Sequence, residues 1–310
     1  MGTPEFAVDS LRAIIDNGFE VCAVITSPDK PAGRGRNLRQ SAVKQFALSQ
    51  GLKVLQPVNL KNAEFLEELE ALQATLFVVV AFRMLPDAVW TMASLGTFNL
   101  HASLLPQYRG AAPINRMIMN GEKKAGVTTF FLRHAIDTGN IIFREETAVW
   151  DHETAGELHD RLKKIGANLV VRTISAIKEG NVTETDQNEF LEAGEELKTA
   201  PKISKEDCRI NWQQNAEQIY NKIRGLSPYP GAFTELATSS GDLLYIKIYC
   251  AHIEDCDQNV KPGSILTDKK SYFKITCRDG CLVIDELQQA GKKRMKIHDF
   301  LMGLKNNVLD

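Results

Sequence analysis

The chain has 310 residues, of which 44% are hydrophobic and 25% charged, and its formal net charge is −2 at pH 7. This composition is typical of a folded protein long enough for two separate cores, and it argues against extended disorder. The slightly negative charge argues against a general nucleic-acid binder, which would carry a basic surplus.

The sequence favours a cytoplasmic protein with reduced cysteines. The longest uninterrupted apolar run, residues 76–82, is far too short to span a bilayer, and no basic segment followed by an apolar one marks a secretory signal. We therefore expect no membrane contact. The six cysteines lack the density or the C-x-x-C spacing of a disulfide or zinc framework, so we also expect no metal.

The first half of the chain alternates helical and strand patterns. Helices are expected at 3–15, with Thr3 as the N-cap, and at 41–50, 63–72, 112–120 and 154–178. Strands are expected at 21–26, near 54, and at 76–81, 97–100, 127–132 and 141–146. This alternation predicts a doubly wound, mainly parallel α/β sheet of Rossmann-like type in a first domain, residues 1–180.

The second half has a different texture. Residues 181–204 lack strong periodicity and are expected to form a linker. After a helical pattern at 217–224, short strand patterns with turn signals follow at 231–236, 243–252, 264–266, 272–277 and 281–287. They indicate a small β-barrel in a second domain, residues 205–310.

Three polar side chains could together move a carbonyl group without a metal. Asn99 and His101 are two residues apart at the end of an expected strand, so they project from the same face. Asp137 lies in an Asp-Thr-Gly turn. An amide suits an oxyanion, an imidazole suits proton transfer near neutral pH, and a carboxylate suits orienting that imidazole. Each residue alone also has an ordinary explanation as a strand-end or turn residue.

The chain resembles the folate-dependent formyltransferases in its pattern Asn99-x-His101-x-Ser103-Leu104-Leu105-Pro106, followed by Asp137-Thr138-Gly139. Segments 2–7, 28–36, 109–114 and 290–293 resemble the bacterial members of that family that act on initiator tRNA, so the resemblance covers essentially the whole chain. It implies a formyltransferase first domain and an OB-like second domain. It also implies formyl transfer from 10-formyltetrahydrofolate to the α-amino group of methionyl-initiator tRNA.

The resemblance also implies roles for individual residues. Asn99 would donate to the oxyanion, His101 would share the oxyanion or relay a proton, and Asp137 would orient His101 and help to accept a proton. The implied folate contacts are Ser103, Leu104, Leu105 and Pro106. The implied tRNA contacts are Lys30, Arg34, Arg36, Lys292, Lys293 and Arg294, although charge clusters of this kind are also typical of solvated loops.

Several alternatives stay open on the sequence. A formyltetrahydrofolate hydrolase, another amine N-formyltransferase, or a noncatalytic tRNA- or folate-binding protein could share these residues. We expect a monomer. Members of the family carry an apolar strand ahead of the Gly-Thr-Pro segment, so we also expect such a strand to belong before Met1.

Overall fold

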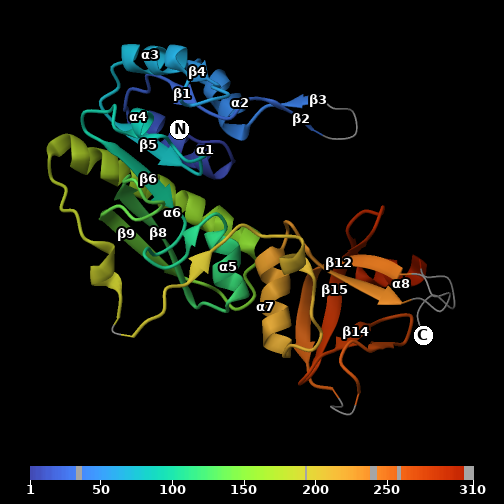
Figure 1. Cartoon of the computed structure of the whole chain (residues 1–310). Helices are drawn as coiled ribbons and strands as arrows, with labels where there is room; N and C mark the ends of the chain where they lie inside the picture. Colours follow the sequence, from blue (N-terminus) through green and yellow to red (C-terminus); the bar gives the residue numbers. More distant parts are fainter. Residues whose placement is uncertain (33–36, 193, 238–242, 257–259, 304–310) are drawn as a thin grey trace. The chain divides into compact units, whose positions relative to one another are not determined.

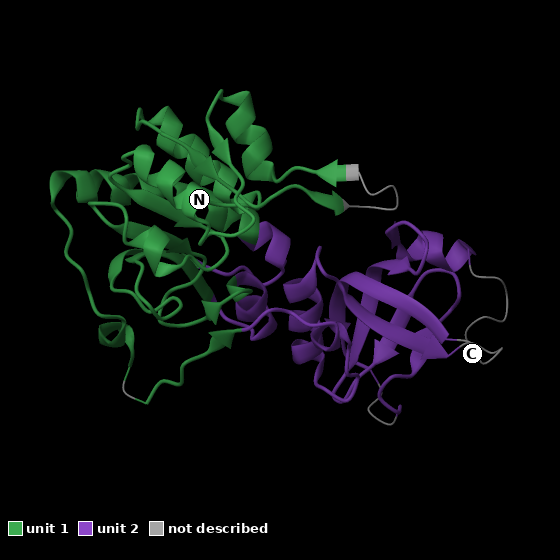
Figure 2. Cartoon of the chain, turned by 45° about the horizontal axis from the view of Figure 1, so that its top comes forward, with its two compact units in different colours: residues 1–113, 124–147, 159–200 green, residues 114–123, 148–158, 201–310 purple. Residues whose placement is uncertain are grey.

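The computed structural model describes residues 1–32, 37–192, 194–237, 243–256 and 260–303 (Figure 1). The chain divides into two compact units, drawn in green and purple in Figure 2. Unit 1 comprises residues 1–113, 124–147 and 159–200, and unit 2 comprises residues 114–123, 148–158 and 201–310. Unit 2 thus includes two short segments, 114–123 and 148–158, that are flanked in sequence by parts of unit 1.

Unit 1 is built on a mixed sheet with the strand order β5-β6-β8-β9. These strands are β5 (Phe77–Val80), β6 (Thr97–His101), β8 (Lys124–Phe131) and β9 (Ile141–Ala148). β5 and β6 are parallel, whereas β6 and β8 are antiparallel. A second parallel pair joins β1 (Val24–Ile25) to β4 (Val54–Leu55). The α/β class predicted from the sequence is therefore confirmed, and the sheet that was expected to be mainly parallel includes an antiparallel pairing of β6 with β8.

The helices of this part of the chain follow the predicted pattern, and a short helix at residues 87–90 was not predicted. They are α1 (Phe6–Asp16), α2 (Ala42–Ser49), α3 (Ala63–Ala71), α4 (Asp87–Trp90), α5 (Pro113–Met119) and α6 (Ala155–Glu179). The predicted N-cap Thr3 is wrong: α1 begins after Glu5, and the Thr3 hydroxyl bonds to the Ser27 hydroxyl at 3.0 Å. Within the described residues, no helix combines the length and apolarity needed to cross a membrane.

Met1 and Gly2 lie between β1 and β5. The Met1 amino group donates to Val78 O at 2.7 Å, Val80 N donates to Met1 O at 2.9 Å, and Gly2 N donates to Ile25 O at 3.0 Å. Below this short bridge is a cavity of about 360 Å³, lined on two sides by residues 21–25 and 74–78 and elsewhere largely by apolar side chains. The catalytic candidates do not line it.

Two short pairings complete unit 1. β2 (Lys30–Ala32) and β3 (Asn37–Arg39) form an antiparallel hairpin that projects from the unit (Figure 1). Residues 181–200, within the predicted linker, include the 3-10 helix η1 (Gln187–Phe190) and β10 (Thr199–Ala200). β10 pairs in parallel with β7 (Arg109–Gly110), directly after the segment that bears Asn99 and His101.

Unit 2 is built on a curled antiparallel sheet with the strand order β11-β12-β15-β14-β13. Its strands are β11 (Ala232–Ala237), β12 (Leu243–Glu254), β13 (Ile265–Thr267), β14 (Phe273–Thr276), β15 (Cys281–Gln289) and β16 (Met295–Lys296), which pairs with β15. The register of β12 on β15 shifts around Cys250, and such bulges help a sheet to curl. The five strands predicted from the sequence are all present.

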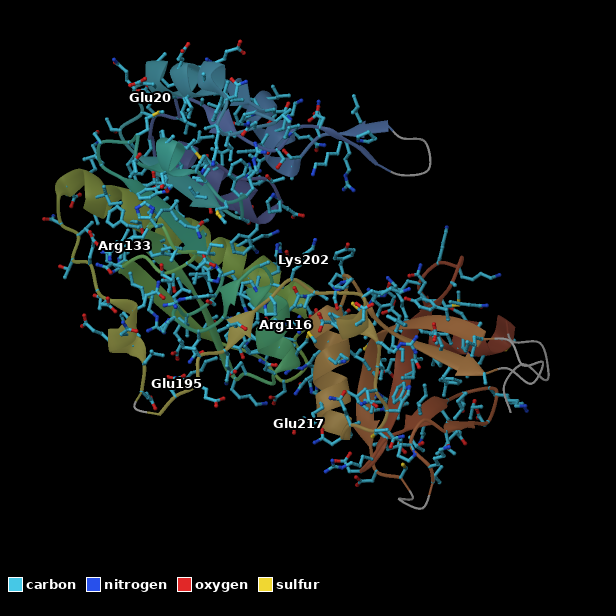
Figure 3. The ribbon with its side chains drawn as sticks, in the orientation of Figure 1. Glu20, Arg116, Arg133, Glu195, Lys202 and Glu217 are labelled. Carbon is cyan, nitrogen blue, oxygen red and sulfur yellow. The ribbon has the colours of Figure 1, made fainter. Side chains whose placement is uncertain are left out.

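Helical elements pack against this sheet, and one of them is bonded to the segment that carries α5. They are η2 (Glu206–Cys208), α7 (Ala216–Leu226), which begins with a capping box from Asn215, and α8 (Ile297–Gly303). Arg116 of α5, labelled in Figure 3, donates to Asp207 Oδ2 at 2.8 Å. Hydrogen bonds from the Ser204 backbone and from Arg116 lower the pKa of the Asp207 carboxyl.

Candidate active site

Strand β6 places Asn99 and His101 on one face of the unit 1 sheet, as their spacing predicts. Phe98 and Leu100, which alternate with them along the strand, are buried on the other face. The Asn99 side chain is half-buried and makes no hydrogen bond to any residue that the structure describes. Its amide is therefore available to donate to a bound group.

His101 is held by a main-chain carbonyl. Its Nε2 lies 2.9 Å from Tyr108 O, and because a carbonyl oxygen only accepts, Nε2 carries the proton. The other ring nitrogen, Nδ1, lies 3.9 Å from Asp137 Oδ2. Nδ1 is thus the ring atom left for proton transfer, and a proton placed on it faces a carboxylate.

Asp137 lies in the connection between β8 and β9, in a tightly constrained turn. Its φ is +54°, a left-handed conformation uncommon for a residue with a side chain. Gly110 N donates to Asp137 Oδ2 at 3.0 Å and fixes the carboxylate. Gly139 closes the turn so tightly that a Cβ there would lie 1.5 Å from Phe131 O. The backbone thus dictates where the carboxylate points, with 14% of the side chain exposed.

The segment predicted to contact folate forms the turn that follows β6. The Ser103 hydroxyl is fully buried and donates to Gln107 O at 2.6 Å. Leu105 is also fully buried, in a small cluster with Phe130 and Ile141. Leu104 is half-buried, whereas Pro106 is buried. Leu104 is therefore the most exposed member of this segment, and the part of its side chain that does not pack against Gly126 can contact a ligand.

Sequence reasoning missed two main-chain contributors to this site, Tyr108 O and Gly110 N. Both lie in a segment fastened by the predicted linker, where Tyr108 N donates to Lys198 O at 2.6 Å. Gln107 donates to Glu195 Oε1 at 2.7 Å, and Figure 3 labels Glu195 on that stretch of chain. Main-chain contacts of this kind do not depend on residue type, so the sequence does not reveal them. Only the short distance in sequence between Asn99 and residues 109–114 indicated that this segment could lie near the site.

The predicted tRNA contacts of unit 1 lie on the β2–β3 hairpin and its connection. Lys30 is exposed and lies opposite Arg39 in the antiparallel register. Arg34 and Arg36 lie outside the described residues. Lys44, which belongs to the same basic stretch of sequence, is paired with Asp29 at 2.7 Å. Hydrogen bonds from Lys44 and Gln56 lower the pKa of the Asp29 carboxyl.

The predicted tRNA contacts of unit 2 lie between β15 and β16. Lys292 and Lys293 are exposed. Arg294 is also exposed, but it donates to Glu286, and its guanidinium lies 4.5 Å from the centre of the Tyr249 ring. The hydrogen bond from Arg294 to Glu286 raises the pKa of the guanidinium, so this charge is partly neutralised within unit 2.

Metal-ligating side chains are dispersed over the two units. Across the described ranges, no cluster of three or more His, Cys, Asp or Glu side chains is suited to hold a metal ion.

Comparison with known proteins identifies the family. Residues 1–174 match the formyl transferase family, and residues 202–305 match the family of formyl transferase C-terminal domains. A methionyl-tRNA formyltransferase of Parabacteroides distasonis is 54% identical over 306 residues, which are 98% of this chain and 94% of the relative. The chain belongs to the methionyl-tRNA formyltransferase family. The resemblance read from the sequence is thereby confirmed.

Other members of the formyltransferase family agree in sequence or in fold. A methionyl-tRNA formyltransferase of Flavobacterium johnsoniae is 50% identical over 304 residues, covering 98% of this chain and 95% of that protein. The structure of an N-formyltransferase from Helicobacter canadensis in complex with folinic acid and dTDP-3-aminofucose superimposes with a TM-score of 0.65 at 24% identity. It covers 93% of this chain and 97% of that one, and at this identity it shows the shared fold alone.

Proposed function

We propose that this chain transfers the formyl group of 10-formyltetrahydrofolate to the α-amino group of methionyl-initiator tRNA. The observation that carries the choice of substrate is the identity of 54% to a methionyl-tRNA formyltransferase across both units. The chemistry is supported by the geometry of unit 1, where a free amide, an imidazole and a carboxylate come from β6 and the Asp137 turn. Together they suit acyl transfer to an amine.

The reaction forms a bond between the amine nitrogen and the formyl carbon and breaks the bond from that carbon to the folate nitrogen. The attacking amine must be neutral, and negative charge develops on the formyl oxygen. Asn99 donates its amide N–H to that oxygen. Asp137 and His101 Nδ1 take up the proton that the amine loses, and the protonated Nδ1 then shares the oxyanion or passes that proton to the departing folate nitrogen. Nε2 stays on Tyr108 O throughout.

The turn 103–106 forms the wall on which the folate ring lies. Leu104, which is half-buried, supplies the apolar contact. Ser103, Leu105 and Pro106 are buried, so they shape the turn from beneath and offer the ligand mainly backbone and edge contacts. Ser103 does not act as a nucleophile in this proposal, because its hydroxyl is buried and donates to Gln107 O.

Formyl transfer is tested with purified protein, the formyl donor and one of three acceptors: charged initiator tRNA, free amines, or buffer alone. Formylmethionyl-tRNA that appears only with charged tRNA supports the proposal. Formate released without any acceptor would indicate a hydrolase. Binding of tRNA or folate without product would indicate a noncatalytic binding protein, and formylation of free amines alone would indicate a different acceptor.

The basic residues Lys30, Arg34, Arg36, Lys292, Lys293 and Arg294 contact the tRNA backbone in this proposal. The double variant Arg34→Ala, Arg36→Ala should bind tRNA more weakly. The slope of log affinity against log salt should become shallower by about 0.7 to 0.9 for each phosphate that the protein no longer neutralises. Filter binding of initiator tRNA over a salt series measures both quantities.

A charge-matched control neutralises two exposed lysines of unit 1 that are remote in sequence from the hairpin, Lys61→Ala with Lys164→Ala. It should leave affinity and salt slope close to those of the parent protein. Equal behaviour of the two double variants would mean that the 30–39 segment serves solubility rather than tRNA binding.

A further inference from the structure

Gln187 lies in unit 1 at the start of η1, within the stretch that the sequence assigns to a linker, and only 3% of it is exposed. Its Nε2 donates to Asp137 O at 2.9 Å and to Gly139 O at 2.8 Å. Its Oε1 accepts from Arg109 Nε at 3.0 Å and from Arg109 Nη2 at 2.6 Å. Both ends of this buried amide are therefore fully used.

The two segments that Gln187 joins are the ones that fix the catalytic carboxylate. The Asp137–Gly139 turn carries the carboxylate itself. Arg109 precedes Gly110, whose N–H donates to Asp137 Oδ2, and follows Tyr108, whose carbonyl holds His101 Nε2. The Gln187 side chain thus links the two segments that hold His101 and Asp137 facing each other.

The Asp137 turn has a particular need of such support. A φ of +54° costs conformational free energy at a residue with a side chain, although aspartate tolerates it better than most residues, so contacts around the turn help to hold it. The bonds from Gln187 Nε2 bracket that residue, because they reach the carbonyls of Asp137 and Gly139. Without them the carboxylate would lose its fixed distance to His101.

The chemistry requires an amide at this position. Arg109 needs an acceptor, which glutamate would also provide. The carbonyls of Asp137 and Gly139 need donors, which a carboxylate lacks, and its oxygen would instead face two oxygens. A glutamate at 187 would therefore keep the side-chain size and the partner of Arg109 while it releases the Asp137 turn.

We propose that Gln187 is a positioning residue for formyl transfer, holding the Asp137 carboxylate towards His101 without touching either substrate. This inference rests on the proposed function. It also means that the predicted linker contributes to catalysis, because Gln187 belongs to that stretch of chain.

Steady-state kinetics of Gln187→Glu and Gln187→Met test this, with Gln50→Glu as the matched control on an exposed glutamine of unit 1. We expect kcat to fall about 10- to 100-fold in both Gln187 variants, as misplacement of a catalytic group by about 1 Å does. KM for either substrate should change less than about threefold, because Gln187 binds neither. The control should match the parent protein, and circular dichroism should show all chains folded.

A double-mutant cycle separates positioning from a general structural role. In an Asp137→Ala background, measured under single-turnover conditions, Gln187→Glu should cause little further loss, because the group that it positions is gone. The same fold loss in both backgrounds would overturn the inference, as would parent-like kcat in both Gln187 variants.

A measurement that does not depend on turnover keeps the inference separate from the proposed function. The ring 15N signals of His101, assigned with His101→Ala, should move in the neutral variant Gln187→Met and stay in place in Gln50→Glu. Absence of formylmethionyl-tRNA from the parent protein would defeat the proposed function alone. Unchanged His101 signals in folded Gln187→Met would defeat the role of Gln187.

Discussion

Replacing Asn99 by alanine should slow formyl transfer about 10²- to 10³-fold, because the amide would no longer donate to the oxyanion. Replacing His101 by alanine should cost about 10²- to 10⁴-fold, the usual contribution of a group that transfers protons in the transition state. Both losses should appear in kcat rather than in KM, since the interactions strengthen only as charge develops. Rapid-quench assays with formylmethionyl-tRNA as the product measure them.

Two exposed residues of the same types serve as controls, Asn188→Ala and His298→Ala, and both should retain parent-like rates. His101→Ala removes the hydrogen bond to Tyr108 O, and the loss of one such bond costs about 0.5 to 1.5 kcal/mol of stability. Melting curves therefore accompany the kinetics. A folded Asn99→Ala or His101→Ala protein with nearly full activity would remove that residue from the mechanism.

An apolar segment of five or six residues joined before Met1 should raise the melting temperature of the protein. We expect it to enter the cavity of about 360 Å³ as a parallel strand between residues 21–25 and 74–78. Each buried aliphatic side chain contributes about 1.5 to 3 kcal/mol, and fixing each residue costs about 1 to 2 kcal/mol. A net gain of about 3 kcal/mol would raise the melting temperature by roughly 6 to 12 °C, which calorimetry resolves.

The same extension should change how stability depends on pH. Burial lowers the pKa of the Met1 amino group to about 5, whereas an exposed amino terminus titrates near pH 8. Between these values the unfolded chain binds an extra proton, so the free energy of unfolding of the 310-residue chain should decrease as pH falls from about 8 to about 5. In the extended chain an amide replaces the amine, and this contribution should vanish.

An extension of equal length built from alternating Asp and Lys is the control, because it cannot enter an apolar cavity at low cost. It also converts the amine to an amide, so it isolates the effect of filling the cavity from the effect of removing the charge. Equal melting temperatures for the apolar and the charged extensions would show that no strand is accommodated there.

Local patterns in the sequence were enough to predict most helices and strands. They also predicted that two of the three catalytic candidates, Asn99 and His101, lie next to each other on one strand. Ser41 caps α2 as its type and position indicate, and the period of two along β6 places Asn99 and His101 on one face. Thr3 failed as a cap because a partner distant in sequence, Ser27, takes its hydroxyl. The antiparallel direction of β8 was equally hidden, since strand direction depends on how the chain returns rather than on residue pattern.

The missed parts of the site are those that depend on long-range or main-chain contacts. Gln187 and Arg109 are 78 positions apart, and no pattern near either residue predicts their hydrogen bond. Gly110 acts through its N–H and Tyr108 through its carbonyl, and every residue other than proline carries both groups. Such contributions follow only from the path of the folded chain.

The carbonyl of Tyr108 also bears on how the site tolerates change. Any amino acid at 108 would offer the imidazole the same oxygen, provided that it accepts the φ of +61° found there. Asparagine and glycine adopt that conformation most readily. A related enzyme with another residue at position 108 would therefore keep the same tautomer of the catalytic histidine. A comparison of the two sequences alone would wrongly indicate that their catalytic centres differ.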